Sequence, residues 1–295
     1  MTNIHSTSTL GPVFIGLPQW QHSSWPKRWF ANRSGTQLAD YARQLNSVEG
    51  NTTFYHLPSS QTVDNWAAAT PADFRFTFKF HSDISHKSSL QHCDKLVTEQ
   101  LNLLARLEHR LGQVMLQLPA GFGPAQLPVL EAFLKRLSPA FSYAVEVRHQ
   151  AFFAKGEEEK ALNRLLMTQG VNRVIMDTRA LFTGPSDSAL TAEVRTKKPR
   201  VPVNVIATSD QPVMRFVGNN NDQDNAACLQ PWIDKCQQWR KQGKACYLFF
   251  HRPDNQDAPW LAQQFIAAYN QRFPDSALPE LNFAPSQDDL QSQLF

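Results

Sequence analysis

Short apolar segments recur along the chain and alternate with stretches whose apolar residues have helical spacing. The candidate strands are FIG (14–16), SVEGN (47–51), FRFTFKF (74–80), GQVMLQL (112–118), SYAVEVR (142–148), RVIMD (173–177), VMRFVG (213–218) and CYLFFH (246–251). A regular alternation of strands with helices is typical of a parallel sheet with helical crossovers. The pattern therefore predicts eight parallel strands.

The helical segments lie between these strands. The clearest apolar stripe consists of Leu96, Val97, Leu101, Leu104, Leu107 and Leu111, and Gly112 follows it where a C-terminal cap is expected. Weaker stripes precede and follow it, and residues 178–212 contain only a short predicted helix around Ala189 to Lys197. This stretch indicates an insertion between strands six and seven.

Eight β/α units in 295 residues fit a (β/α)8 TIM-like barrel better than a doubly wound sheet. No low-complexity segment or charged linker divides the chain. We therefore predict a single domain over residues 1–295, with a core at about 13–273 and short tails at both ends.

The alternation within each strand predicts which side chains face the lumen of the barrel. In FRFTFKF the phenylalanines share one face, which the helices should cover, and Arg75, Thr77 and Lys79 share the other. The same rule applied to the remaining strands turns these polar residues inward: Glu49, Asn51, Gln113, Gln117, Glu146, Arg148, Asp177, Arg215 and His251. In RVIMD the rule places Ile175 inside together with Asp177.

Many of these polar residues lie at the carboxyl ends of their strands, where TIM barrels carry their active sites. Unpaired buried charges are costly, so the charged members must pair with one another, with water or with a ligand. These members are Glu49, Lys79, Glu146, Arg148, Asp177 and Arg215. A closed ion-pair network that only fills the lumen is the alternative to a functional site.

The motifs VEGNTTFY, FRFTFKF followed by ISH, VMLQLPAGFGP, YAVEVRH and GVNRVIMD together resemble the domain of unknown function 72 family of YecE-like proteins. The resemblance extends from about IGLPQW almost to the C-terminus. It implies a TIM-like barrel and no established activity. After the last strand, many members of the family carry an Asn-Asn pair, and this chain has HRPDNQDAPW instead.

Composition limits the classes of function. The net charge of +3 is too small to indicate a dedicated nucleic-acid-binding protein. The four cysteines show neither metal-ligand nor disulfide spacing, and the sequence contains no signal peptide or membrane-length apolar run. We therefore expect a cytoplasmic protein with reduced thiols, no membrane association and no predicted cofactor. The sequence does not indicate an oligomeric state.

The polar ring suggests acid/base chemistry on an anionic molecule. Lys79, Arg148 and Arg215 could bind a phosphate or a carboxylate, with Asn51 and Gln117 as further ligand-binding residues. Glu49, Glu146, Asp177 and His251 are the candidate catalytic acids and bases. Trp20 and Tyr55, just beyond the first two strands, could stack on a ligand or could pack at the rim. The leading hypothesis is an enzyme, of the hydrolase, lyase or isomerase type, that acts on a small anionic metabolite, for example a phosphorylated one, at the C-terminal face of the barrel.

Three alternatives remain open. The four candidate acids and bases could bind a divalent metal for hydrolysis. The RTKKPR stretch (195–200) could contribute to nucleic-acid processing, although a solvated loop is the simpler interpretation. A non-catalytic ligand-binding barrel is the third alternative.

Overall fold

Eight parallel strands form one sheet with the order β1-β8-β7-β6-β5-β4-β3-β2. The structure is a computed structural model that describes residues 10–30 and 36–283. The strands are β1 Val13–Gly16, β2 Ser47–Gly50, β3 Arg75–Lys79, β4 Leu111–Gln117, β5 Tyr143–Glu146, β6 Asn172–Asp177, β7 Val213–Val217 and β8 Cys246–His251. The predicted TIM-like α/β fold is confirmed, with each strand ending within two residues of its predicted bounds. Residues 1–9 and 284–295 of the predicted tails lie outside the described residues.

Side chains and a close backbone approach bring β1 and β2, the two ends of the sheet, together. The Glu49 backbone N–H donates to the Leu17 carbonyl at 2.9 Å. The amide of Asn46 accepts from the Ile15 backbone N–H and donates to the Val13 carbonyl, both at 2.8 Å. A Cβ at Gly16 would lie only 2.5 Å from the carbonyl oxygen of residue 47, so this approach requires glycine. The sheet is therefore a nearly closed barrel.

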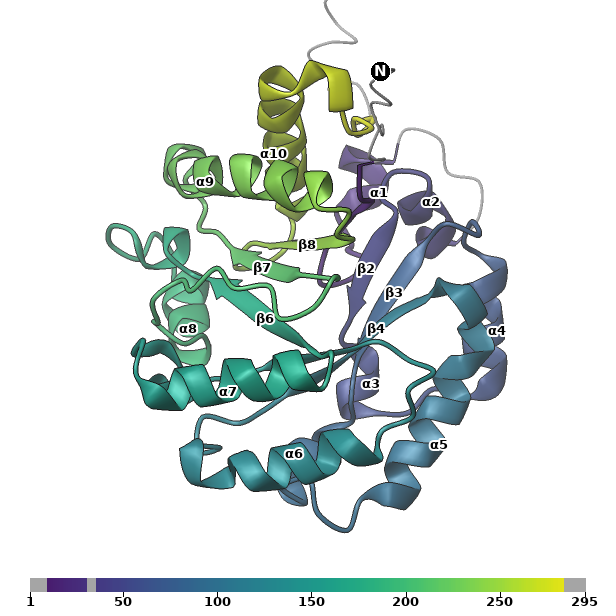
Figure 1. The fold of residues 1–295 in the computed structure, drawn as a ribbon. Helices are drawn as coiled ribbons and strands as arrows, with labels where there is room; N and C mark the ends of the chain where they lie inside the picture. Colours follow the sequence, from purple (N-terminus) through teal and green to yellow (C-terminus); the bar gives the residue numbers. More distant parts are fainter. Residues whose placement is uncertain (1–9, 31–35, 284–295) are drawn as a thin grey trace, which may run out of the picture.

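Helices surround the strands (Figure 1). The α-helices are α1 Trp25–Arg28, α2 Gln37–Ala42, α3 Thr52–Tyr55, α4 Ser60–Ala68, α5 Asp94–Leu104, α6 Leu127–Arg136, α7 Glu157–Thr168, α8 Ala189–Lys197, α9 Asp222–Lys241 and α10 Ala258–Arg272. A π-helix spans Asp83–Lys87, and short 3-10 helices span Ala105–Arg110, Pro124–Gln126, Gln150–Phe153, Ala180–Phe182 and Pro274–Ser276. In the part of the chain that the structure describes, no helix combines the length and the apolar character needed to cross a membrane.

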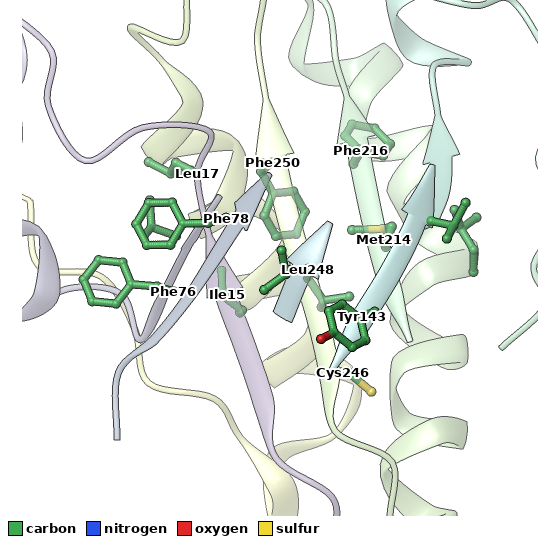
Figure 2. Packing of buried hydrophobic residues seen from close by; sticks show 14 of the residues in the cluster. Ile15, Leu17, Phe76, Phe78, Tyr143, Met214, Phe216, Cys246, Leu248 and Phe250 are labelled. Atoms are coloured by element: carbon green, nitrogen blue, oxygen red, sulfur yellow. The ribbon is translucent and has the colours of Figure 1, made fainter. Parts of the chain in front are cut away.

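The larger hydrophobic core lies between the strands and the helices. Phe76 and Phe78 of β3 belong to it, as do Ile15 of β1 and Met214 of β7 (Figure 2). A second, smaller cluster fills the lumen and consists of Met115, Ala144, Val174, Val213, Tyr247 and Phe249. The predicted inward and outward faces are thus confirmed for β3, β4, β5, β7 and β8.

The prediction for β6 was wrong. Ile175 packs in the outer core, whereas Val174 belongs to the lumen cluster. Asp177 accordingly faces the helices, where its Oδ2 accepts from Trp232 Nε1 of α9 at 2.8 Å. Arg179 donates to the same carboxylate from Nε and Nη2. Three consecutive apolar residues, 174–176, gave no alternation from which the inward face could be identified.

The predicted helix cap at Gly112 was also wrong. The α-helix ends at Leu104, a 3-10 segment follows, and Gly112 is already the second residue of β4. A Cβ at Gly112 would lie 2.9 Å from the hydroxyl of Tyr247, so this glycine provides room for a lumen side chain.

The insertion between β6 and β7 contains α8, with the bounds that the sequence predicts. Asn204, farther along the insertion, donates to both carboxylate oxygens of Glu159 on α7, at 2.8 and 3.0 Å. Glu159 is also paired with buried Arg173 of β6 at 2.8 Å. These contacts attach the segment that leads from α8 back to β7 to the outer surface of the barrel.

Candidate active site

A buried ion-pair network occupies the carboxyl-terminal half of the lumen, and Arg215 of β7 is at its centre. Arg215 donates from Nε to Oε2 of Glu49 at 2.6 Å and from Nη2 to Oε1 at 2.8 Å. Its Nη1 donates to Oε2 of Glu146. The side chains of β2, β5 and β7 converge here because every strand of a closed barrel turns alternate residues into the lumen.

Arg148 extends the network from β5 towards the mouth of the barrel. Its Nε and Nη2 both lie 2.9 Å from Oε1 of Glu146. Glu146 is almost fully buried, whereas the Arg148 side chain is about one-fifth exposed. The carboxylate is therefore enclosed between two guanidinium groups, and only the upper one contacts solvent.

Lys79 of β3 is a further basic partner of Glu49. Its Nζ donates to Oε1 of Gln117 at 2.9 Å and lies 3.4 Å from Oε1 of Glu49. The ring of Phe54 is also near this ammonium group, with its centroid at 5.9 Å. Lys79 is buried, so its charge depends on these contacts for compensation.

His251, the last residue of β8, completes the contacts of Glu49. Its Nε2 lies 3.2 Å from Oε2 of Glu49. Burial lowers the pKa of His251 to about 4, although Glu49 opposes this effect. The imidazole is therefore neutral at pH 7 and donates from Nε2, since an ionised carboxylate can only accept.

The two carboxylates remain ionised in this environment. Burial raises the pKa of Glu49, but Arg215, Lys79 and His251 outweigh it and hold the pKa well below its usual range. For Glu146, burial is likewise outweighed by Arg215 and Arg148, and its pKa is about 2. Neither carboxylate is poised to exchange a proton near pH 7, so both are better suited to fixing their basic partners.

A cavity of about 360 Å³ opens directly above this network. It is lined by Pro18, Asn51, Phe54, Tyr55, Lys79, Gln117, Arg148, Val194, Lys197, Lys198, Arg215, His251 and Asn255. Five of these described residues are Lys or Arg, and none is Asp or Glu. Two carboxylates, Glu49 and Glu146, lie beneath the cavity. Four basic side chains surround them, namely Lys79, Arg148, Lys198 and Arg215, so basic groups outnumber acidic ones at the site.

Comparison with known proteins identifies the family of this barrel. The model of the family described as "Protein of unknown function DUF72" matches residues 14–283. The UPF0759 protein YecE of Escherichia coli K12 is 44% identical over 279 residues, which is 94% of this chain and 99% of the relative. The chain belongs to the DUF72 family.

Solved DUF72 structures share the fold. The DUF72 protein EF0366 of Enterococcus faecalis V583 has a TM-score of 0.65 at 21% identity, over 93% of this chain and 99% of that one. The DUF72 protein TM1631 of Thermotoga maritima MSB8 has a TM-score of 0.62 at 19% identity, and the match covers 90% of this chain and 100% of that one. At these identities the likeness shows the barrel and nothing about its chemistry.

Most of the predicted site residues of this DUF72 barrel lie together. The cavity or the network beneath it contains Glu49, Asn51, Tyr55, Lys79, Gln117, Glu146, Arg148, Arg215 and His251. Asn51 donates to the Pro18 carbonyl at 2.8 Å and so joins the ends of β1 and β2. The ring of Tyr55 stands at the rim, and the residue is 64% exposed.

Two predicted site residues lie elsewhere. Asp177 faces the helix layer, as described above. Trp20 packs edge-on against Trp66 of α4, with centroids 5.3 Å apart, and against the outward face of β3. Of the two interpretations of Trp20, its contacts favour packing.

Residues that the sequence pattern did not indicate also line the cavity. Lys198, at the end of α8, was interpreted as a solvated loop residue and instead joins Arg215 in the cavity wall. Phe54 and Asn255 line the same cavity. Lys198 lies in an insertion rather than on a strand, so the alternation rule could not locate it.

The ligand set suggested for a divalent metal is not assembled. Asp177 is bound to Trp232 outside the lumen, and Glu49 and Glu146 share the Arg215 guanidinium. Among residues 10–30 and 36–283, no group of three or more His, Cys, Asp or Glu side chains has a metal-binding arrangement.

Proposed function

We propose that the cavity above Arg215 binds a small anionic metabolite, one that carries a phosphate or a carboxylate, and that the protein is an enzyme that performs acid/base chemistry on it. The observation that carries this proposal is the one-sided charge of the wall, where five basic and no acidic side chains line the described cavity. Desolvated basic groups without enough counter-charge favour the entry of an anion.

Arg148 is the strongest candidate for direct contact with the anion. Its Nε and Nη2 point to Glu146, which fixes the guanidinium plane. Its Nη1 has no hydrogen-bond partner within the described residues and the side chain reaches the cavity. A planar group held in this way can donate to an incoming oxyanion with little loss of side-chain entropy.

His251 is the candidate proton carrier. The carboxylate of Glu49 accepts from Nε2 and thereby orients the ring, which leaves Nδ1 with a lone pair. Glu49 and Glu146 are positioning residues in this proposal, because Arg215 occupies both of them.

Nucleic-acid processing is a second candidate, and the rim of the cavity favours it. The exposed Tyr55 ring lies beside Phe54, with centroids 5.2 Å apart, next to a basic cavity. An aromatic ring at such a rim could stack on a base while the basic groups contact the phosphate.

Calorimetric titration separates these possibilities. The wild type and Arg148→Gln are titrated with inorganic phosphate, ribose 5-phosphate and a short single-stranded oligonucleotide. The matched control is Arg106→Gln, since Arg106 forms an exposed ion pair with Asp64 away from the barrel mouth. Loss of a charged hydrogen bond of about 1.5 to 3 kcal/mol corresponds to roughly 10- to 150-fold weaker binding.

We expect the small anions to bind and Arg148→Gln alone to lose affinity. Tight binding of the oligonucleotide only, weakened by Tyr55→Ala, would favour the second candidate. The proposal would be contradicted if the wild type, Arg148→Gln and Arg106→Gln bound every anion with equal affinity, or if none of them bound any anion. Binding with no turnover of any of a panel of phosphorylated and carboxylated metabolites would favour the non-catalytic barrel.

A further inference from the structure

Lys198 occupies an unusual position for a residue of an insertion. Its backbone N–H donates to the Val194 carbonyl at 3.1 Å, which ends α8. The next carbonyl, that of Pro199, accepts from Oγ1 of Thr178 at 3.0 Å, and Thr178 directly follows β6. The insertion is therefore tied to the mouth of the barrel at the point where the Lys198 side chain enters the cavity wall.

The amine of Lys198 differs from the other basic groups of the cavity in its contacts. Lys79 is paired with Glu49, Arg148 with Glu146, Arg215 with both carboxylates, and Lys197 with Glu193 on its own helix. Within the described residues, Lys198 Nζ has neither a hydrogen-bond partner nor an ion-pair partner. An amine that is held at a cavity wall without a carboxylate has its lone pair available once the proton leaves.

The surroundings of Lys198 promote loss of that proton. The charged and titratable groups that act on it come from five strands and are Glu49, Lys79, Glu146, Arg215 and His251. Burial and the positive charge of Arg215 lower the pKa of Lys198 to about 7, against the opposing effect of Glu146. A lysine that served only to attract anions would need its charge, and this site weakens the charge.

We propose that Lys198 is a covalent nucleophile that forms an imine with the carbonyl group of an anionic aldehyde or ketone. The inference rests on the proposed anion site, since Arg148 and Lys79 would hold the anionic group. The lone pair of Nζ adds to the carbonyl carbon, and the oxygen takes up a proton to give a carbinolamine. Loss of the hydroxyl group with the remaining amine proton releases one water and leaves the C=N bond.

Reductive trapping tests this step. The wild type is incubated at pH 7 with glyoxylate, an aldehyde that carries a carboxylate, and sodium cyanoborohydride, and the modified lysines are identified by peptide mass spectrometry. Ordinary lysines have pKa values of about 10.4 and are almost fully protonated at this pH. We expect Lys198 to be modified at least about 10-fold faster than its neighbour Lys197, with a rate that is half-maximal near pH 7.

Two variants act as controls. Lys198→Arg keeps the charge but cannot form an imine, so it should lose the fast modification and still bind phosphate within a few-fold of the wild type. Lys235→Arg, on α9 and hydrogen-bonded to Gln238, should leave the fast modification unchanged. Inorganic phosphate should slow modification of Lys198 because it competes for the anionic subsite.

The outcomes distinguish this inference from the proposed function. If phosphate binds but Lys198 reacts no faster than Lys197, the proposal that Lys198 is a nucleophile is overturned, whereas the proposed anion site is retained. If propanal modifies Lys198 as fast as glyoxylate does, and phosphate neither binds nor slows the reaction, the anionic substrate class and the proposed function are both overturned. If Lys198→Arg retains fast modification at another lysine, the assignment to Lys198 is wrong.

Discussion

The Arg215 guanidinium and the Glu49 carboxylate form two parallel hydrogen bonds, of 2.6 and 2.8 Å, inside the barrel lumen. Glu49 is also within 3.4 Å of Lys79 and 3.2 Å of His251. One carboxylate thus holds three basic side chains from three other strands. Because these three side chains line the cavity, Glu49 fixes their positions in the cavity wall.

Removal of Glu49 should strongly destabilise the fold. Glu49→Ala leaves Arg215 with one carboxylate and Lys79 with only an amide, in a region with almost no solvent access. Breaking a buried ion pair by removing one partner costs about 3 to 5 kcal/mol. Urea denaturation measures this loss, with Asp64→Ala, which breaks an exposed ion pair with Arg106, as the control that should change little. Equal stability of the two variants would contradict the role of Glu49 as the central counter-charge.

His251 should make stability depend on pH in a defined window. Its pKa is about 4 in the folded protein and 6.5 as its ordinary value. Between these values the unfolded chain binds more protons, so the free energy of unfolding falls as the pH drops from 6.5 to 4, by roughly 3 kcal/mol from this group. Glu146, with a pKa of about 2 against 4.5, adds a separate loss at lower pH.

The variant His251→Asn isolates this contribution. Asparagine keeps a donor for Glu49 but does not titrate, so unfolding curves recorded from pH 7 to 4.5 should have a shallower pH dependence than those of the wild type. Indistinguishable pH dependences would show that His251 is not buried in its neutral form.

Asp177 should matter for stability and not for ligand binding. Asp177→Ala leaves the buried indole N–H of Trp232 without its acceptor, which costs about 1 to 3 kcal/mol. Thermal unfolding measures this cost, and phosphate titration checks that affinity is unchanged. A large loss of phosphate affinity in a variant that remains folded would show that Asp177 contributes to the binding site.

The alternation of apolar and polar residues was sufficient to predict the barrel and most of the cavity. It succeeded in β3, where Phe76 and Phe78 mark the outward face without ambiguity, and this placed Lys79 correctly. It failed in β6, where both faces are apolar and the direction of Asp177 had no marker.

The remaining features depend on contacts that are distant in sequence. Lys198 enters the cavity because Thr178 and Asn204 tie the insertion to the end of β6 and to α7. The partners in each of these contacts are more than 20 residues apart along the chain, so no periodic pattern in the sequence predicts them. Which basic groups share which carboxylate likewise depends on the register of the strands.

An anomalous diffraction measurement on crystals soaked in sodium selenate at pH 6.5 tests the central claim most directly, because it locates an oxyanion without knowledge of the substrate. This pH is below the pKa of about 7 of Lys198, so the protonated amine predominates, and the Arg148 guanidinium is charged. We predict an anomalous peak in the cavity above Arg215, within hydrogen-bond distance of Arg148 and of Lys198 or Lys79. Selenate bound at other basic groups, such as Arg179 and Arg200 on the outer surface, with none at the mouth of the barrel, would contradict the claim.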